Sequence, residues 1–163
     1  KKVLFPLETL PFVALGSALF HSLISIMVWL LAYVLLFGTP HVTTLLLPLI
    51  LLPIALFSLG LTWALAALGV YLRDVAQVVG IFTTALMFLS PIFYPVSALP
   101  ETYRPLMQLN PLTPSIEQAR DILFWGRIPD MSTFGLSMLA GLLVAWTGFA
   151  CFQKIRKGFA DVL

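Results

Sequence analysis

Three long stretches without a charged residue dominate this chain and restrict how it can fold. Asp, Glu, Lys and Arg are absent from residues 9–72, 75–100 and 131–153. About 20 consecutive apolar residues cross a bilayer as one helix. The second and third stretches therefore predict one membrane span each, and the first is long enough for two. The composition agrees, because charged residues make up only 10% of the chain, compared with roughly 25% in soluble domains.

The first stretch contains a strong break at Gly38-Thr39-Pro40-His41, where glycine and proline favour a turn. We therefore expect four spans, at about 10–37, 44–71, 75–95 and 131–153. Helices are favoured over a barrel, because barrel strands alternate polar and apolar residues and a helix satisfies its own backbone in lipid. Pro48 and Pro53 lie inside the second span and should kink it. The predicted fold is an all-α membrane protein.

The segment between the third and fourth spans is rich in proline and carries charges of both signs. It predicts two short helices within about 100–126. The first should begin at Pro100-Glu101 and end at Asn110-Pro111, because a residue before proline avoids the helical region. The second should have Thr113 as its N-cap and end at Gly126. Both are too short to span a bilayer, so we expect them to lie at the interface or to re-enter the protein.

The positive charges predict the orientation. On one side of the predicted spans lie Lys1, Lys2, Arg73, Lys154, Arg156 and Lys157, and on the other lie Arg104, Arg120 and Arg127. Cytoplasmic segments carry the excess of Lys and Arg, so both ends of this chain should be cytoplasmic. The two short helices are then on the extracytoplasmic side.

No catalytic set is recognisable. The chain has no GxxxxGK[ST], HExxH or GxSxG motif, which would indicate phosphate binding, zinc chemistry or a serine nucleophile. His21 adjoins Ser22, but no acidic residue lies in the same span to orient it, so a helix-packing contact is favoured over an intramembrane enzyme. Cys151 is the single cysteine, which excludes an internal disulfide. We predict no metal and no cofactor in this chain, and a net charge of +2 is too small to indicate nucleic acid.

Two features are consistent with transport, and each has a simpler interpretation. Five aromatic residues lie in or beside the second and third spans: Trp63, Phe82, Phe88, Phe93 and Tyr94. They either face lipid and pack between helices or line a passage on which sugar rings could slide. Arg73-Asp74 either anchors the ends of two spans at the interface or forms a tight inside turn that couples them.

Five segments, in this order, resemble type-2 ABC-transporter permeases of the branch that exports polysaccharides (O-antigen, capsule or teichoic-acid type). They are KKVLFP at 1–6, GVYLRDVAQVV at 69–79, LSPIFYPVSALP at 89–100, LNPLTPSIEQARDILFWGRIPD at 109–130 and FADVL at 159–163. The resemblance covers essentially the whole chain. It implies a permease that moves a lipid-linked polysaccharide or polyol-phosphate polymer outward across the bacterial inner membrane. An exporter of drugs or small glycolipids is the alternative.

The same resemblance implies partners and roles. The family has six spans per subunit, forms a homodimer and uses a separate ATPase subunit that binds ATP and Mg, so the N-terminal interfacial helix and first two spans would be absent here. Residues coupling to the ATPase would be Lys1, Lys2, Val3, Leu4, Phe5 and Pro6. An outer gate would contain Pro91, Pro95, Asn110, Pro111 and Arg120. Arg73 and Asp74 would form the inside turn, and the aromatic third span would border the glycan channel.

Overall fold

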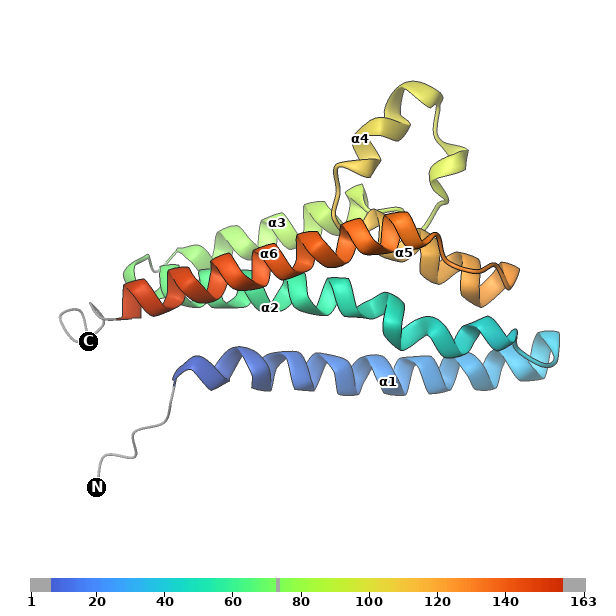
Figure 1. Ribbon diagram of the computed structural model, residues 1–163, viewed down its shortest axis with the longest axis horizontal. Coiled ribbons are helices and arrows are strands. Elements are labelled where there is room, and N and C mark those ends of the chain that lie inside the picture. The colour runs from blue at the N-terminus through green and yellow to red at the C-terminus, as the bar shows by residue number, and fades with distance from the viewer. Residues whose placement is uncertain (1–6, 73, 157–163) are drawn as a thin grey trace. The chain divides into compact units, whose positions relative to one another are not determined.

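The computed structural model describes residues 7–72 and 74–156, in which the regular secondary structure consists of helices joined by turns and short loops (Figure 1). The chain divides into two compact units, Lys1–Pro40 and His41–Leu163, each of which is described by itself. Among the described residues, the helices long and apolar enough to cross a membrane are Leu10–Phe37, Val42–Tyr71 and Met131–Ile155.

The first unit consists mainly of α1 (Leu10–Phe37), which follows a 3₁₀ turn, η1 (Leu7–Thr9). Its 28 residues give a length of about 42 Å, more than the ~30 Å of a hydrocarbon core. Near its C-terminal end the rings of Trp29 and Tyr33 lie 5.0 Å apart, and those of Tyr33 and Phe37 lie 5.3 Å apart. The helix ends at Gly38, whose φ of +90° suits a residue without Cβ. The predicted first helix and the break after it are confirmed.

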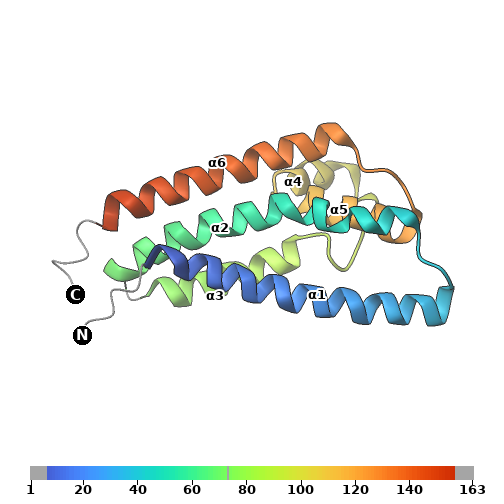
Figure 2. The same ribbon diagram turned by 60° about the horizontal axis from the view of Figure 1, so that its bottom comes forward.

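The second unit is built on the contact between α2 (Leu47–Tyr71) and α6 (Met131–Ile155), which lie side by side in Figures 1 and 2. A 3₁₀ turn, η2 (Val42–Leu46), precedes α2. Large apolar side chains fill the space between the elements of this unit. The buried hydrophobic residues are Leu47, Ile50, Leu59, Trp63, Ala67, Ile122 and Phe152.

Glycines let the backbones of α2 and α6 approach closely. A Cβ on Gly60 would collide with the backbone of Val144, and a Cβ on Gly148 would collide with the backbone of Gly60. One on Gly141 would lie 2.7 Å from the carbonyl oxygen of Pro53. Small residues at helix contacts are the usual means of close packing in membranes, and here they fix the register of α2 against α6.

Two prolines were expected to kink the second span, and only Pro53 lies in the interior of α2. Pro48 occupies the first turn of α2, where a proline costs no backbone hydrogen bond, so the prediction of a kink there is wrong. Pro53 is inside the helix and buried, and Figure 1 shows α2 bending in its first half. The helix bends there because proline has no backbone N–H to donate to the preceding turn of the helix.

The helix predicted over 75–95 is shorter in the structure. α3 covers Val75–Leu89, and Ser90 then adopts an extended backbone with ψ of 145°. The following Pro91 disfavours a helical conformation at Ser90, so the chain leaves the helix and forms a turn over 90–96. The 15 residues of α3 rise about 22 Å, less than the ~30 Å of a hydrocarbon core.

The segment after this turn contains the two expected short helices. The 3₁₀ turns η3 (Val96–Ala98) and η4 (Glu101–Tyr103) lead into α4 (Arg104–Gln108). After it, α5 (Thr113–Arg120) continues into a π-helical turn, η5 (Asp121–Trp125), and ends at Gly126 with φ of +62°.

Gly126 confirms the predicted stop, and the ring of His41 occupies the space that a Cβ would need. The predicted cap is wrong, because α5 begins at Thr113 and the hydroxyl of this residue has no partner among the described residues. The side chain of Asn110 accepts a hydrogen bond from the Leu112 amide instead, at 3.0 Å.

Candidate functional site

The turn after α3 is held by buried polar side chains. Ser90 is fully buried, and its hydroxyl donates to the carbonyl oxygen of Leu86 at 2.6 Å. The side-chain amide of Asn110 donates to the Ser90 hydroxyl at 2.9 Å. A buried polar group without a partner costs about 1–3 kcal/mol, so these bonds fix the end of α3 to the loop between α4 and α5.

Arg120 of α5 joins the same turn from the other side. Its Nη2 donates to the carbonyl oxygen of Pro91 at 2.5 Å and lies 3.5 Å from those of Ile92 and Tyr94. Its Nη1 forms an ion pair with Glu117 one helical turn earlier. Glu117 in turn accepts from the backbone amide of Val96 at 3.4 Å. The pair therefore holds both ends of the 90–96 turn against α5.

The structure brings together three members of the predicted outer gate. Pro91 is buried, Asn110 and Arg120 are half-buried, and the three meet around the 90–96 turn. Pro95 is exposed in that turn, and Pro111 is exposed and lines a neighbouring cavity.

Glu117 and Ser90 complete this cluster and were not predicted. The spacing of Glu117 and Arg120, three residues apart on a helix, is a signal for such an ion pair. Nothing in the sequence indicates the contact of Ser90 with Asn110, because the two meet only through the fold.

A second polar group lies where α6 begins. Asp130 is the N-cap of α6 and accepts from the amides of Ser132 and Thr133 at 3.3 and 2.9 Å. The hydroxyl of Thr133, which donates to the same carboxylate, lowers the pKa of Asp130 below its ordinary 3.8, and the backbone bonds add to the effect. The side chain of Gln118 donates to the Asp130 carbonyl oxygen at 3.0 Å, which ties α5 to α6.

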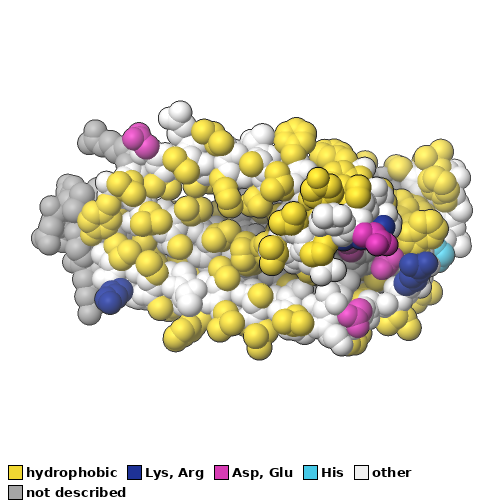
Figure 3. Space-filling view, turned by 90° about the horizontal axis from the view of Figure 1, so that it is seen from above, with side chains coloured by type: hydrophobic (Ala, Val, Ile, Leu, Met, Phe, Trp, Pro, Cys, Tyr) yellow, Lys and Arg dark blue, Asp and Glu magenta, His cyan; other side chains and the backbone are white. Residues whose placement is uncertain are grey.

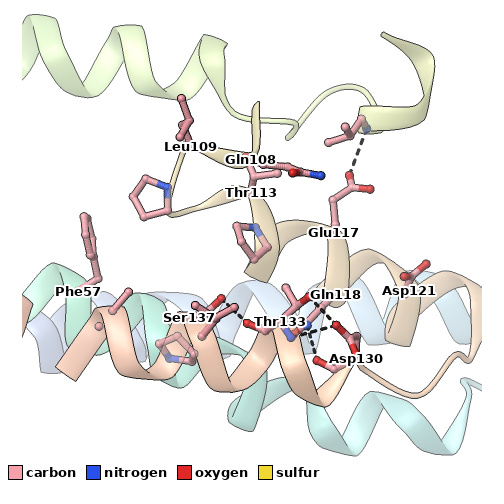
Figure 4. A pocket seen from close by; sticks show the side chains of 17 residues that line it. Phe57, Gln108, Leu109, Thr113, Glu117, Gln118, Asp121, Asp130, Thr133 and Ser137 are labelled. Atoms are coloured by element: carbon pink, nitrogen blue, oxygen red, sulfur yellow. Dashed lines mark hydrogen bonds between the residues drawn. The ribbon is translucent and has the colours of Figure 1, made fainter. Parts of the chain in front are cut away.

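A cavity of about 750 Å³ opens beside these groups, between α2, α6, α5 and the loop after α4 (Figure 4). In Figure 4 the acidic side chains Glu117, Asp121 and Asp130 lie toward one end, and Phe57 and Leu109 lie toward the other. The cavity therefore has a polar end at the start of α6 and an apolar end farther along the helix pair.

Charged side chains gather at the ends of the helices. On the face seen in Figure 3 the middle is mainly hydrophobic, while basic and acidic groups gather near α4 and α5 and isolated ones lie at the opposite end. The salt bridge between Arg127 and Asp121 is long, at 3.7 Å, and mostly exposed. This distribution matches an apolar belt between two polar interfaces.

The five aromatic residues proposed for a passage have different surroundings. Trp63 is 6% exposed and packs its ring edge against Phe149, with centroids 5.0 Å apart. Phe82, Phe88 and Phe93 are 59%, 61% and 71% exposed. The hydroxyl of Tyr94 donates to the carbonyl oxygen of Phe88 at 3.3 Å.

The remaining predicted residues are those of the N-terminal segment, the Arg73-Asp74 pair and His21. Lys1, Lys2, Val3, Leu4, Phe5, Pro6 and Arg73 fall outside the described residues. Asp74 is exposed just before α3, and its carbonyl oxygen accepts from the amides of Gln77 and Val78. His21 is exposed on α1, and none of the hydrogen bonds found among the described residues involves its ring. No cluster of three potential metal ligands occurs in the described part of the chain.

Long apolar helices that pack through glycines, and a polar segment folded back on their ends, define a multi-pass membrane protein. Residues 1–124 match the family described as ABC-2 type transporter, and the chain belongs to that family. It is 28% identical over 98% of its length to the O-antigen export system permease protein RfbA of Myxococcus xanthus. It is 25% identical over its whole length to the protein of that name in Klebsiella pneumoniae. The chain spans 62% and 63% of the lengths of these two relatives.

Proposed function

We propose that this chain is the membrane permease of an ATP-driven exporter that moves a lipid-linked polysaccharide or polyol-phosphate polymer out of the cytoplasm across the bacterial inner membrane. The observation that carries the proposal is the similarity to O-antigen export permeases along 98% of the chain. In this proposal the permease does no covalent chemistry and holds no cofactor. ATP and Mg bind to a separate ATPase subunit, and two permease copies form the passage.

The proposed topology adds a fourth crossing to the three long helices. In it α3 and residues 90–95 together make the third crossing in chain order, and α4 and α5 re-enter the protein from the extracytoplasmic side. The uneven distribution of Lys and Arg supports this orientation, with both ends of the chain in the cytoplasm. Coupling to the ATPase is assigned to residues 1–6 and to the inside turn at Arg73 and Asp74.

The proposed outer gate is the 90–96 turn together with α5. The support is the set of bonds from Arg120 to Pro91, from Glu117 to Val96 and from Asn110 to Ser90. A displacement of α5 would have to break these bonds or carry the end of α3 with it. In this proposal, motion of α5 at the outer side is coupled to α3, whose other end adjoins the inside turn at Arg73 and Asp74.

The proposed glycan passage is bordered by the exposed rings of α3 and of the turn that follows, Phe82, Phe88 and Phe93. Flat rings stack on the apolar faces of sugars and impose little register, which suits a polymer that slides. Trp63 is not assigned to this wall, because its buried ring packs against Phe149 of α6.

A complementation experiment tests this function. The complete permease is expressed with its ATPase in a strain that makes an O-antigen but lacks the corresponding export permease, and surface polymer is measured. We expect surface polymer to return, and to be lost when the phosphate-loop lysine of the ATPase is changed to alanine. Drug resistance without surface polymer would contradict the proposal and indicate a small-molecule exporter. The variant His21→Ala should export normally, and loss of a covalent activity in it would indicate an enzyme instead.

A further inference from the structure

The helix α5 buries polar side chains against the rest of the second unit. The residues that it buries are Thr113, Ser115 and Gln118, whereas α2 and α6 bury large apolar side chains such as Trp63 and Phe152. Polar groups that leave a protein contact form new hydrogen bonds with water, while apolar groups lose the whole benefit of burial. The contact of α5 therefore costs less to open than the contact between α2 and α6.

The packing between α5 and α6 is also incomplete. The cavity of about 750 Å³ has Glu117 and Gln118 of α5 in its lining on one side and Ser137 of α6 on another (Figure 4). Atoms that border a cavity have no packing partners on that side. Little packing energy is therefore lost when the two helices move apart.

The side chain of Gln118 joins α5 to α6. It is buried, and its amide donates to the carbonyl oxygen of Asp130, at the start of α6, over 3.0 Å. Figure 4 shows Gln118 directed toward α6, whereas its neighbour Glu117 is directed toward the 90–96 turn. Glu117 and Arg120 bind that turn, so a movement of α5 would carry the turn with it.

The C-terminal end of the same helical segment is anchored differently. Ile122, in η5, is fully buried, and its carbonyl oxygen accepts a hydrogen bond from the Thr43 hydroxyl at 2.8 Å. The ring of His41 lies against Gly126, where η5 ends. Thr43 and His41 directly precede α2, so an apolar contact and a hydrogen bond hold this end to the pair of α2 and α6.

We propose that Gln118 is the latch of the outer gate. Its bond to Asp130 holds α5 against α6, and when this bond breaks, α5 turns about Ile122 and carries the 90–96 turn away from α6. Gln118 is a positioning residue, which acts through the helix that carries it. The inference rests on the outer gate proposed above and adds the residue that keeps this gate closed.

Labelling of buried cysteines tests the latch in the complete permease bound to its ATPase. Two reporters are made in a background without other cysteines: Ser115→Cys in the moving part, where Ser115 is 3% exposed, and Ile122→Cys at the pivot, where Ile122 is 0% exposed. A water-soluble maleimide reacts only when the site opens, so the labelling rate follows the open population. Substrate and ATP are left out, so the result does not depend on what is exported.

The latch is removed by Gln118→Met, which keeps the length of the side chain but cannot donate a hydrogen bond. We expect Ser115→Cys to be labelled about fivefold to tenfold faster in this variant, as the loss of one hydrogen bond predicts. Gln118→Glu directs an oxygen at the carbonyl oxygen of Asp130 and should give at least the same increase. The labelling rate of Ile122→Cys should stay the same in both variants.

A second glutamine gives the control. Gln108 lines the same cavity, and its side chain makes no hydrogen bond among the described residues, so Gln108→Met should leave both labelling rates unchanged. A third reporter, Ala67→Cys, lies in α2 at a residue that is 0% exposed and should stay protected in every variant.

Two results would overturn the proposal. An unchanged rate at Ser115→Cys in the Gln118→Met variant would show that Gln118 does not hold α5 in place. Equal acceleration at Ile122→Cys or Ala67→Cys would show that α5 detaches as a whole or that the protein unfolds. Neither result bears on export itself, which the complementation experiment tests separately.

Discussion

Asp130 contacts two neighbouring elements, one through its side chain and one through its backbone. Its carboxylate caps α6, and its carbonyl oxygen receives Gln118 of α5. The bonds from Thr133 and Ser132 stabilise the ionised carboxylate and lower its pKa. A group whose pKa is lowered by folding stabilises the protein above its unfolded pKa, and this stabilisation is lost as the pH falls through its folded pKa.

The first prediction concerns the pH dependence of stability. The part of the stability that Asp130 contributes should be fully present above the ordinary pKa of 3.8 and should be lost below it. Asp130→Asn keeps the cap and should lack this pH dependence. Thermal unfolding in detergent between about pH 7 and about pH 3 measures the difference. An identical pH profile in both proteins would contradict the assignment.

The second prediction concerns Arg120 and the turn it holds. Arg120→Met leaves the carbonyl oxygen of Pro91 and the carboxylate of Glu117 without their partner, so we expect a loss of about 2–4 kcal/mol in the free energy of unfolding. Arg120→Lys should recover only part of it, because an ammonium cannot reach both groups in the same geometry.

A neighbouring arginine gives the control for that measurement. The side chain of Arg127 is 69% exposed and its ion pair is long, so Arg127→Met should cost at most about 1 kcal/mol. Denaturant or thermal unfolding compares the variants. Equal effects of the Arg120 and Arg127 changes would mean that the 90–96 turn is not held by Arg120.

At the scale of the elements, α2 and α6 form the frame on which the other parts of the second unit are placed. Their contact depends on backbone approach at Gly60 and Gly148. In lipid the hydrophobic effect does not drive helices together, so close packing supplies the association. α5 contacts both helices of this frame, so the position of the polar cluster depends on it.

The third prediction tests this contact. Gly148→Ala places a methyl group against the backbone of Gly60 and should destabilise the protein by about 1–3 kcal/mol. Gly135→Ala, on the same helix, meets nothing within 4 Å and should be neutral or stabilise by up to about 1 kcal/mol. Thermal unfolding of the two variants measures both effects. A neutral Gly148→Ala would show that the helices are not in this register.

At the scale of the whole molecule, the segment after α3 gives the protein different chemistry at the two ends of its helices. Most of the described acidic residues lie between η4 and the start of α6, while the last described basic residues, Lys154 and Arg156, lie at the other end of α6. The α6 helix is long enough to span a bilayer. These two polar ends are therefore expected on opposite sides of the membrane.

The fourth prediction is the sidedness of these ends. With Cys151, the single cysteine, replaced by serine, a cysteine at Glu101 should react with an impermeant maleimide added to the extracytoplasmic side. Glu101 suits this because its side chain is 91% exposed. A cysteine at Lys154 should react only after the membrane is permeabilised. The reverse pattern would invert the topology and remove the basis for outward export.

The sequence alone was sufficient to predict the long helices and the residues at which they end. An uncharged run has one low-energy conformation in lipid, and Gly38 and Gly126 end helices because they accept a backbone that other residues resist. Prolines were less reliable guides, because the effect of Pro48 depends on where the helix begins. Local rules therefore predicted α1, α2 and α6 and the existence of α4 and α5.

Tertiary structure alone decided which polar groups meet. Arg120 and Pro91 are 29 positions apart, and Asn110 and Ser90 are 20 apart, so no local rule pairs them. The hydroxyl of Thr113 lacks a cap role because the helix begins at Thr113 itself and Leu112 is at the N-cap position. Trp63 is buried because the glycines bring α6 close to α2. Hydropathy determines which residues enter the membrane, whereas contacts between distant residues determine the polar cluster around Arg120 and the cavity.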